Sequence, residues 1–216
     1  MIHGMYCRKM TLVASLSALF SLALNASAKG HPRLGFQSTP TLEVFVYGFP
    51  GLSTALLQEA EAETDRILNP VSIRLDWINC ISRTVTPSCF LPQLATDITV
   101  RFLPKALPQA AATALGFANS SADSAAAFLF YDRIAALRTE KRLLFPMFGR
   151  VLAHEITHLL LPNEAHSDSG LMRGLWSTAD LTVTSTACLG LSARSIQLMY
   201  GEALRRVRIK DRAMGR

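Results

Sequence analysis

The sequence predicts one α/β (α+β) domain in which helices cover a small sheet. Three observations favour this class. After residue 40, segments typical of strands and helices follow one another in the order strand, helix, strand, strand. A long apolar segment then leads into residues 151–161, which predict a buried helix that carries two histidines. A last helical segment with one apolar face completes a pattern of helices packed on a sheet.

The first 28 residues have the three parts of a secretory signal peptide. Arg8 and Lys9 precede an apolar run over residues 10–24, and Ala26-Ser27-Ala28 is a small-residue cleavage site. The apolar run is shorter than the roughly 20 residues that a membrane span needs. We therefore expect residues 29–216 to be a secreted, soluble single domain without a membrane span, and an uncleaved anchor is the alternative.

The first half of this domain divides at clear breaks. Segments rich in β-branched and aromatic residues predict strands, and apolar residues at helical spacing predict a helix. Pro50-Gly51 ends the first strand, Ser53 can cap the helix, and Asn69-Pro70 stops it. We expect a strand over 42–49, a helix over 54–68 with Leu56, Leu57, Ala60, Ile67 and Leu68 inward, and strands over 71–78 and 97–103.

The second half begins with an alanine-rich stretch, residues 104–124, which Pro104, Pro108 and Gly116 break into an expected irregular loop. Residues 126–134 predict a last strand, for which the edge of the sheet is one position. A helix should cover residues 143–161, with Pro146 in its first turn. Ser192 should cap a final helix that reaches about residue 208, with Ile196, Met199, Ala203 and Leu204 inward.

The strongest chemical signal is the run His154-Glu155-Ile156-Thr157-His158. Histidines four residues apart lie on one face of a helix, roughly 5 to 6 Å apart at Cβ, so both imidazoles can reach one metal ion. Glu155 would lie beside the open coordination position of that ion, where a carboxylate can take a proton from water. This is the HExxH arrangement, which predicts a zinc (Zn²⁺) site.

A third histidine follows a break in this helix. Pro162 cannot continue the helix, and Asn163 can reverse the chain, so His166 can return toward the metal. Three protein ligands leave the fourth position of a catalytic zinc ion for water and substrate.

The pattern of these residues resembles the metzincin zinc peptidases, and among them the matrixins most. The resemblance rests on the HExxH run, the turn, His166-Ser167 and the segment Gly170-Leu171-Met172. It implies a zincin-like fold with a small twisted mixed sheet, an N-terminal helix, an active-site helix and a C-terminal helix. It also implies an edge strand that pairs with extended substrate. The implied site has zinc on His154, His158 and His166, Glu155 as general base, and Met172 beneath the metal.

The third ligand has two alternatives. The metzincin signature would place the third histidine at the position of Glu164, two residues before His166, and a carboxylate is also a legitimate zinc ligand. Glu202 of the final helix is the other candidate. We expect His166, with Glu164 as the main alternative.

These residues predict a secreted zinc metallopeptidase, most simply a metalloendopeptidase, that acts on peptides or proteins. One alternative is a catalytically inert zincin-like protein that binds a partner or the cell surface. Glu155 argues against it, because a structural metal site has no use for a base. Another alternative is a zinc hydrolase that does not cleave peptides.

Cysteines and charge complete the predictions. Cys80 and Cys89 flank a short loop and could pair in an oxidising compartment, which leaves Cys188 as a buried free thiol. The formal net charge is +6, and a basic tail favours contact with solvent or with an anionic cell surface. No nucleic-acid-binding motif accompanies the charge, so we expect no nucleic-acid partner. The tail consists of Arg205, Arg206, Arg208, Lys210, Arg212 and Arg216.

Overall fold

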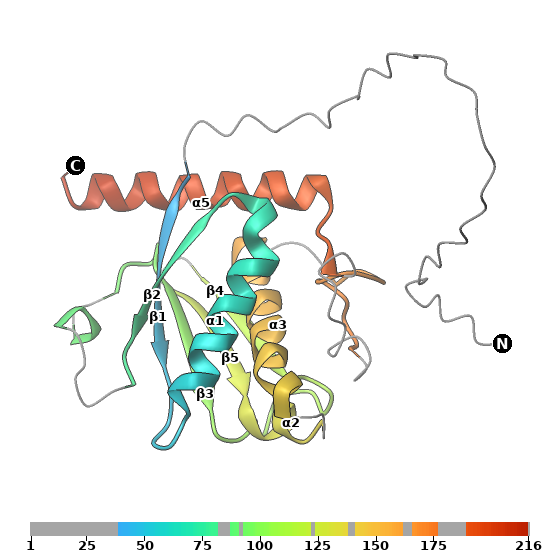
Figure 1. Cartoon of the computed structure of the whole chain (residues 1–216). Coiled ribbons are helices and arrows are strands. Elements are labelled where there is room, and N and C mark those ends of the chain that lie inside the picture. The colour runs from blue at the N-terminus through green and yellow to red at the C-terminus, as the bar shows by residue number, and fades with distance from the viewer. Residues whose placement is uncertain are drawn as a thin grey trace, which may run out of the picture. The chain divides into compact units, whose positions relative to one another are not determined.

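A five-stranded mixed sheet lies at the centre of the computed structural model, which describes residues 39–81, 87–90, 93–121, 124–137, 141–161, 166–176 and 189–215 (Figure 1). Its strands are β1 (Thr41–Tyr47), β2 (Arg74–Asn79), β3 (Ile98–Leu103), β4 (Gly116–Ser120) and β5 (Ala125–Phe130). They lie in the order β2-β1-β3-β5-β4. Only β4 is antiparallel to its neighbour among these described strands.

Helices pack on this sheet and confirm the predicted α/β (α+β) class. The α-helices are α1 (Thr54–Leu68), α2 (Tyr131–Ala135), α3 (Lys141–Leu160) and α5 (Ala193–Ala213), and short 3₁₀ turns are η1 (Asn69–Val71) and η2 (Pro87–Phe90). Figure 1 shows α1 and α3 side by side in front of the sheet, where they contact each other extensively. Helix α5 crosses the top of this view and contacts α3, β1 and η1.

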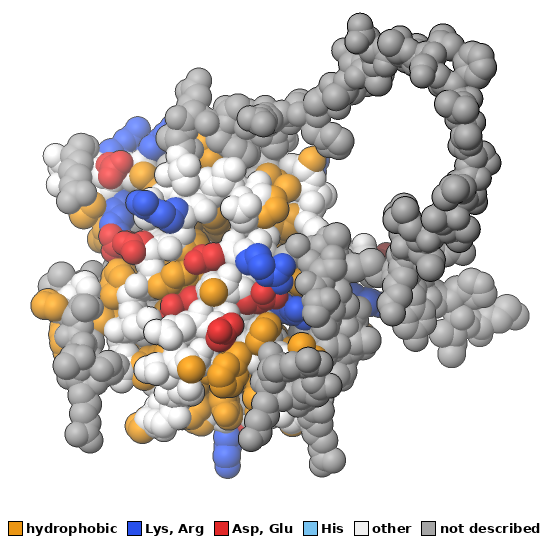
Figure 2. All heavy atoms as spheres, in the orientation of Figure 1, with side chains coloured by type: hydrophobic (Ala, Val, Ile, Leu, Met, Phe, Trp, Pro, Cys, Tyr) orange, Lys and Arg blue, Asp and Glu red, His pale blue; other side chains and the backbone are white. Residues whose placement is uncertain are grey.

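Helix α1 has the predicted bounds. The side-chain oxygen of Ser53 accepts a hydrogen bond from the Leu56 amide and so caps its first turn. The five residues predicted to face inward are all buried. Figure 2 shows acidic side chains gathered near the middle of the outer face, over the region where Figure 1 places α1; this helix carries Glu59, Glu61 and Asp65 there.

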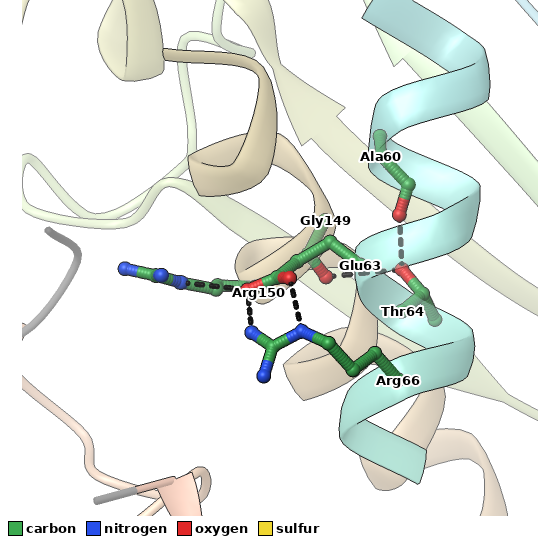
Figure 3. A network of polar contacts seen from close by, with 6 residues as sticks. All are labelled: Ala60, Glu63, Thr64, Arg66, Gly149 and Arg150. Carbon is green, nitrogen blue, oxygen red and sulfur yellow. Dashed lines mark hydrogen bonds and ion pairs between the residues drawn. The ribbon is translucent and has the colours of Figure 1, made fainter. Parts of the chain in front are cut away.

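Helices α1 and α3 pack closely against each other at Gly149. A Cβ atom at this position would lie 2.5 Å from Cβ of Glu63 and 2.6 Å from the carbonyl oxygen of Ala60. The hydroxyl of Thr64 donates a hydrogen bond of 3.0 Å to the Gly149 carbonyl (Figure 3). Beside this hydrogen bond, the guanidinium of Arg150 on α3 binds the carboxylate of Glu63 on α1 at 3.0 Å. These contacts fix α3 against the rest of the fold.

The edge of the sheet differs from the prediction. Residues 126–134 were expected to be one strand at the possible edge, but β5 ends at Phe130 and lies between β3 and β4. An interior strand of a sheet that is covered by helices is apolar throughout, as the sequence Ala-Ala-Ala-Phe-Leu-Phe is. The edge strand beside β5 is β4, which lies inside the expected irregular loop. Stacking of Phe117 on Phe128, with centroids 4.4 Å apart, holds β4 in place.

Other boundaries shift by a few residues. The Asn69-Pro70 stop continues as a 3₁₀ turn, and Ser72 takes a left-handed conformation (φ 58°), so β2 begins at Arg74 rather than at residue 71. Helix α3 begins at Lys141, which places Pro146 inside the helix instead of in its first turn. Ser192 caps α5 as predicted, but the helix continues to Ala213. Strand β1 ends at Tyr47, two residues early.

A disulfide joins Cys80 and Cys89, which confirms the predicted pairing. None of the helices in the described ranges has both the length and the apolar character needed to cross a bilayer. Several predictions concern residues outside the described ranges, among them the signal peptide over 1–28, the turn at Pro162 and Asn163, the alternative ligand Glu164 and the free thiol of Cys188.

Candidate metal and active site

The C-terminal half of α3 carries the first two histidines of the site. Helix α3 is buried on most sides by the sheet and by α1, and residues 151–157 are all buried. His154 and His158 lie one turn apart with ring centroids 4.7 Å apart and ring planes at 84°. Their Nε2 atoms are 3.1 Å apart, so both rings point at the same place. The helix therefore produces the geometry that the spacing predicts.

His166 reaches the same place from the segment that follows the helix. Its Nε2 lies 3.1 Å from Nε2 of His158. A tight turn supports this segment, because the Ser167 amide donates a hydrogen bond of 2.7 Å to the Met172 carbonyl. Gly174 lies under the imidazole, where a Cβ atom would be 3.1 Å from Cβ and Cγ of His166. This turn and Gly174 hold His166 beside the helix, and the predicted chain reversal at Pro162 and Asn163 stays a prediction.

The three imidazoles fit a metal ion. One ligand atom from each of His154, His158 and His166 lies within 4.8 Å of the others. Nδ1 of His154 lies 2.7 Å from the carbonyl oxygen of Leu171. A carbonyl only accepts, so Nδ1 carries the hydrogen and Nε2 presents a bare lone pair. Imidazole nitrogens that converge in this way could hold a shared cation, and three of them suit zinc.

The protonation state of the histidines agrees with this fit. Burial lowers the pKa of His154 to about 4; the hydrogen bond to Leu171 opposes this shift, and the charge of His166 adds to it. Burial, with the charges of His154 and His166, lowers the pKa of His158 to about 4. Both rings are neutral at pH 7, which is the form of imidazole that binds metals.

Glu155 lies beside this cluster and outside it. Its side chain is 5% exposed, and burial raises its pKa to about 8. The carboxyl group lies against the start of β4, because a Cβ atom at Gly116 would be 2.9 Å from Oε1 of Glu155 and 2.5 Å from the Phe128 carbonyl oxygen. Only glycine leaves room for the carboxyl group at this position. Gly116 was expected to break an irregular loop, but it lies in a strand, where glycine often marks such a close approach.

A cavity of about 820 Å³ opens in front of these groups. Its walls come from β4 with the segment before it, α2 and the residues after it, α3, and the segment around His166. Trp176 lines it and packs edge-on against His154, with ring centroids 5.5 Å apart. The cavity is large enough to hold several residues of a peptide.

The segment Gly170-Leu171-Met172 supports His154 through its backbone. Gly170 has a left-handed conformation (φ 74°), which lets the next residue direct its carbonyl at the imidazole. Met172 is 6% exposed. The placement of Met172 beneath a metal ion stays a prediction.

The structure tests one of the two alternatives to His166 as the third ligand. The carboxylate of Glu202 binds Arg205 at 2.7 Å and Arg206 at 2.8 Å on α5, and it is not part of the cluster, so that alternative is wrong. Glu164 lies outside the described residues. Among the described residues, His166 is the group that joins His154 and His158.

Comparison with solved structures identifies the fold, whereas comparison of the sequence finds no match. Neither the family models nor the curated proteins that were compared with the sequence match it. The structure is similar to a zinc-dependent peptidase from Methanocorpusculum labreanum, with a TM-score of 0.54, 12% identity, and coverage of 72% of this chain and 99% of that chain. Archaemetzincin from Methanopyrus kandleri matches with a TM-score of 0.48, 14% identity, and coverage of 76% and 96%. Metalloproteinase-II from Bacteroides fragilis matches with a TM-score of 0.48, 15% identity, and coverage of 76% and 53%.

The first of these similarities, with the mixed sheet and the helices, shows that the chain has the zincin-like fold of a zinc-dependent peptidase. The three histidines form a cluster that could bind a metal ion within that fold. The finer resemblance to matrixins stays a prediction.

Proposed function

We propose that this protein is an exported zinc-dependent peptidase, in which His154, His158 and His166 hold the metal and Glu155 is the general base. The observation that carries the proposal is the convergence of the imidazole Nε2 atoms, with two contacts of 3.1 Å, next to a buried carboxyl group. A bound zinc ion would supply Lewis acidity, which makes water a stronger acid and a carbonyl carbon more electrophilic.

Glu155 performs the proton transfers in this proposal. It follows the ligand His154 directly in α3, and its carboxyl group lines the cavity beside Gly116. Burial alone raises the pKa of this carboxyl group to about 8, and the charge of a bound zinc ion would lower it, so that the carboxylate accepts a proton from the attacking water and delivers that proton to the leaving amine. Glu155 is buried, so few solvent molecules can form hydrogen bonds to its carboxyl group in place of the attacking water.

Strand β4 offers a place for the substrate backbone. It pairs with β5 along one edge and lines the cavity over Gly116–Ser120. An extended peptide can add to such an edge through backbone hydrogen bonds, which give affinity without regard to side chains. This places the scissile bond in front of Glu155 and the histidines.

Two features support export. The predicted signal peptide over residues 1–28 directs the chain out of the cytoplasm. The disulfide between Cys80 and Cys89 is of a kind that persists in oxidising compartments. The N-terminal sequence of the protein recovered outside the cell tests this part, with Lys29 expected as the first residue.

Digestion of casein and of a peptide library by the zinc-loaded protein tests the activity. We expect wild type to cleave peptide bonds, Glu155→Ala to lose activity while it keeps its zinc, and the control Glu59→Ala, which removes an exposed carboxylate on α1, to behave as wild type. Zinc binding without cleavage of any peptide would favour the inert binding protein or a hydrolase of another class. Loss of zinc in Glu155→Ala would contradict the role of this residue as a base.

A further inference from the structure

The side chain of Arg133 forms part of the cavity wall at the segment that leads into β4. Its Nη1 donates hydrogen bonds to the carbonyl oxygens of Ala111, at 2.5 Å, and Ala114, at 2.7 Å. The guanidinium also lies over the ring of Phe130, 5.3 Å from the centroid. Three contacts therefore hold this cation in one orientation, which reduces the entropy that it loses when it binds a ligand.

The other donors of this guanidinium have no acceptor among the described residues. No hydrogen bond or ion pair joins Arg133 to Glu155, which is the only acidic residue among the described residues that line the cavity. Arg173 and three histidines also line it. The described lining of the cavity therefore carries two arginines and one acidic residue, whereas the α1 face carries several carboxylates (Figure 2).

The segment that Arg133 binds leads directly to the residue that contacts Glu155, the proposed general base. Ala114, which accepts its hydrogen bond, is two residues before Gly116, and Gly116 contacts the Glu155 carboxyl group. A peptide that adds to β4 would thus pass the guanidinium within a few residues of the scissile bond. A planar guanidinium whose remaining donors have no acceptor among the described residues matches the geometry of a carboxylate.

We propose, on the basis of the peptidase function above, that Arg133 is a specificity-determining residue that binds a carboxylate of the substrate. The carboxylate belongs either to an acidic side chain near the scissile bond or to the free C-terminus of the peptide. The first source makes the protein an endopeptidase with a preference for acidic residues, and the second makes it a carboxypeptidase.

A set of matched peptides distinguishes these sources. In one arm, each position in turn holds Glu or Gln; in the other, the same peptide ends in a carboxylate or an amide. Mass spectrometry locates the cleaved bond, and kcat/KM is measured for each member of a pair. We expect one arm to show a preference for the carboxylate of at least about tenfold, as for a charge-assisted hydrogen bond. A ratio near one in both arms would overturn the proposal.

Variants of Arg133 test whether this residue is the cause. Arg133→Gln should bring the preferred ratio close to one, and Arg133→Lys should keep part of it. The ratio is the readout, because a loosened segment before β4 lowers both rates together. Arg208→Gln removes the same charge from the exposed side of α5 and should keep the wild-type ratio. An unchanged ratio in folded Arg133→Gln, or an equal loss in Arg208→Gln, would overturn the assignment.

Binding measurements separate this proposal from the proposed function. Calorimetric titration of the same peptides into zinc-loaded Glu155→Gln measures affinity where hydrolysis is blocked. If wild type cleaves no peptide but the carboxylate peptides bind at least about tenfold more tightly in an Arg133-dependent manner, the peptidase function fails and the carboxylate site stands. If no peptide binds and none is cleaved, both fail.

Discussion

Arg206 of α5 donates a hydrogen bond of 2.9 Å from Nη2 to the backbone carbonyl of Leu159, the residue that follows His158. The last carbonyls of a helix have no partner within the helix, so this contact satisfies one of them at the end of α3. The same guanidinium binds Glu202 at 2.8 Å and is 4% exposed. Helix α5 therefore stabilises the turn of α3 that carries the second histidine.

Replacement of Arg206 should cost stability. Arg206→Ala leaves the Leu159 carbonyl and Glu202 without this partner, and we expect a loss of about 3 kcal/mol in the free energy of unfolding. Arg205→Ala is the matched control, because Arg205 binds the same Glu202 but its side chain is 59% exposed, and it should cost less than about 1 kcal/mol. Urea unfolding of the metal-free proteins measures both. Equal losses would show that burial of Arg206 adds nothing.

The two helical glycines should respond to alanine in opposite directions. Gly149→Ala places a Cβ atom 2.5 Å from Glu63, so we expect a loss of about 1 to 3 kcal/mol in stability. Gly201 in α5 has nothing within 4 Å of that position, and Gly201→Ala should raise stability by up to about 1 kcal/mol. Thermal unfolding of the pair tests this contrast. A stable Gly149→Ala would mean that α1 and α3 can separate without penalty.

Gly116→Ala should separate activity from metal binding. The added methyl group would meet the Phe128 carbonyl at 2.5 Å and Oε1 of Glu155 at 2.9 Å, so β4 or the carboxyl group must move. A displacement of about 1 Å at a catalytic group can cost roughly 100-fold in rate. We expect a loss of that order in kcat with one zinc retained per chain. Wild-type kcat in this variant would show that the position of Glu155 is not critical.

Alkaline pH should remove the contribution of Lys210. Burial lowers its pKa, but hydrogen bonds and the charges of Asp97 and Glu43, each 2.8 Å away, outweigh burial, so its pKa is raised. A folded pKa above the unfolded value means that the stabilisation is complete below the usual lysine pKa of about 10.4 and is lost as pH rises through the folded pKa.

Urea unfolding of wild type and Lys210→Met measures this contribution. The difference in stability should be constant from about pH 8 to 9 and should shrink above about pH 10.4. A difference that persists unchanged at the highest pH at which both proteins fold would mean that the packing of the side chain, and not its charge, stabilises the fold.

The elements that the sequence predicts well are those in which several local signals agree. Helix α1 has a capping serine, an apolar stripe and a proline stop, and its bounds are those predicted. Strand β4 has no such agreement, because Gly-Phe-Ala-Asn-Ser has little intrinsic preference for a strand. Pairing with the following strand β5 and the stacking of Phe117 on Phe128 hold it, and neither contact follows from the strand preference of these five residues.

In the candidate site, too, some features follow from local sequence patterns and others do not. The convergence of His154 and His158 follows from helical spacing alone, and His166 follows from a break and a short return. Two other features arise between segments that are distant in the sequence, so the sequence does not predict them. They are the contact between Gly116 and Glu155 and the fixed orientation of Arg133.

The basic tail was predicted to be solvated, which is wrong for Arg206 because α5 turns that side chain inward. Contact of the other basic residues with an anionic cell surface stays a prediction.

The metal content of the purified protein tests the central claim most directly. Wild type, His166→Ala and Glu164→Ala are dialysed against zinc and then against buffer, and zinc is measured by mass spectrometry. We expect one zinc per chain in wild type and in Glu164→Ala, and loss of zinc in His166→Ala. Zinc lost only in Glu164→Ala would assign the third ligand to that carboxylate, and no zinc in wild type would contradict the account.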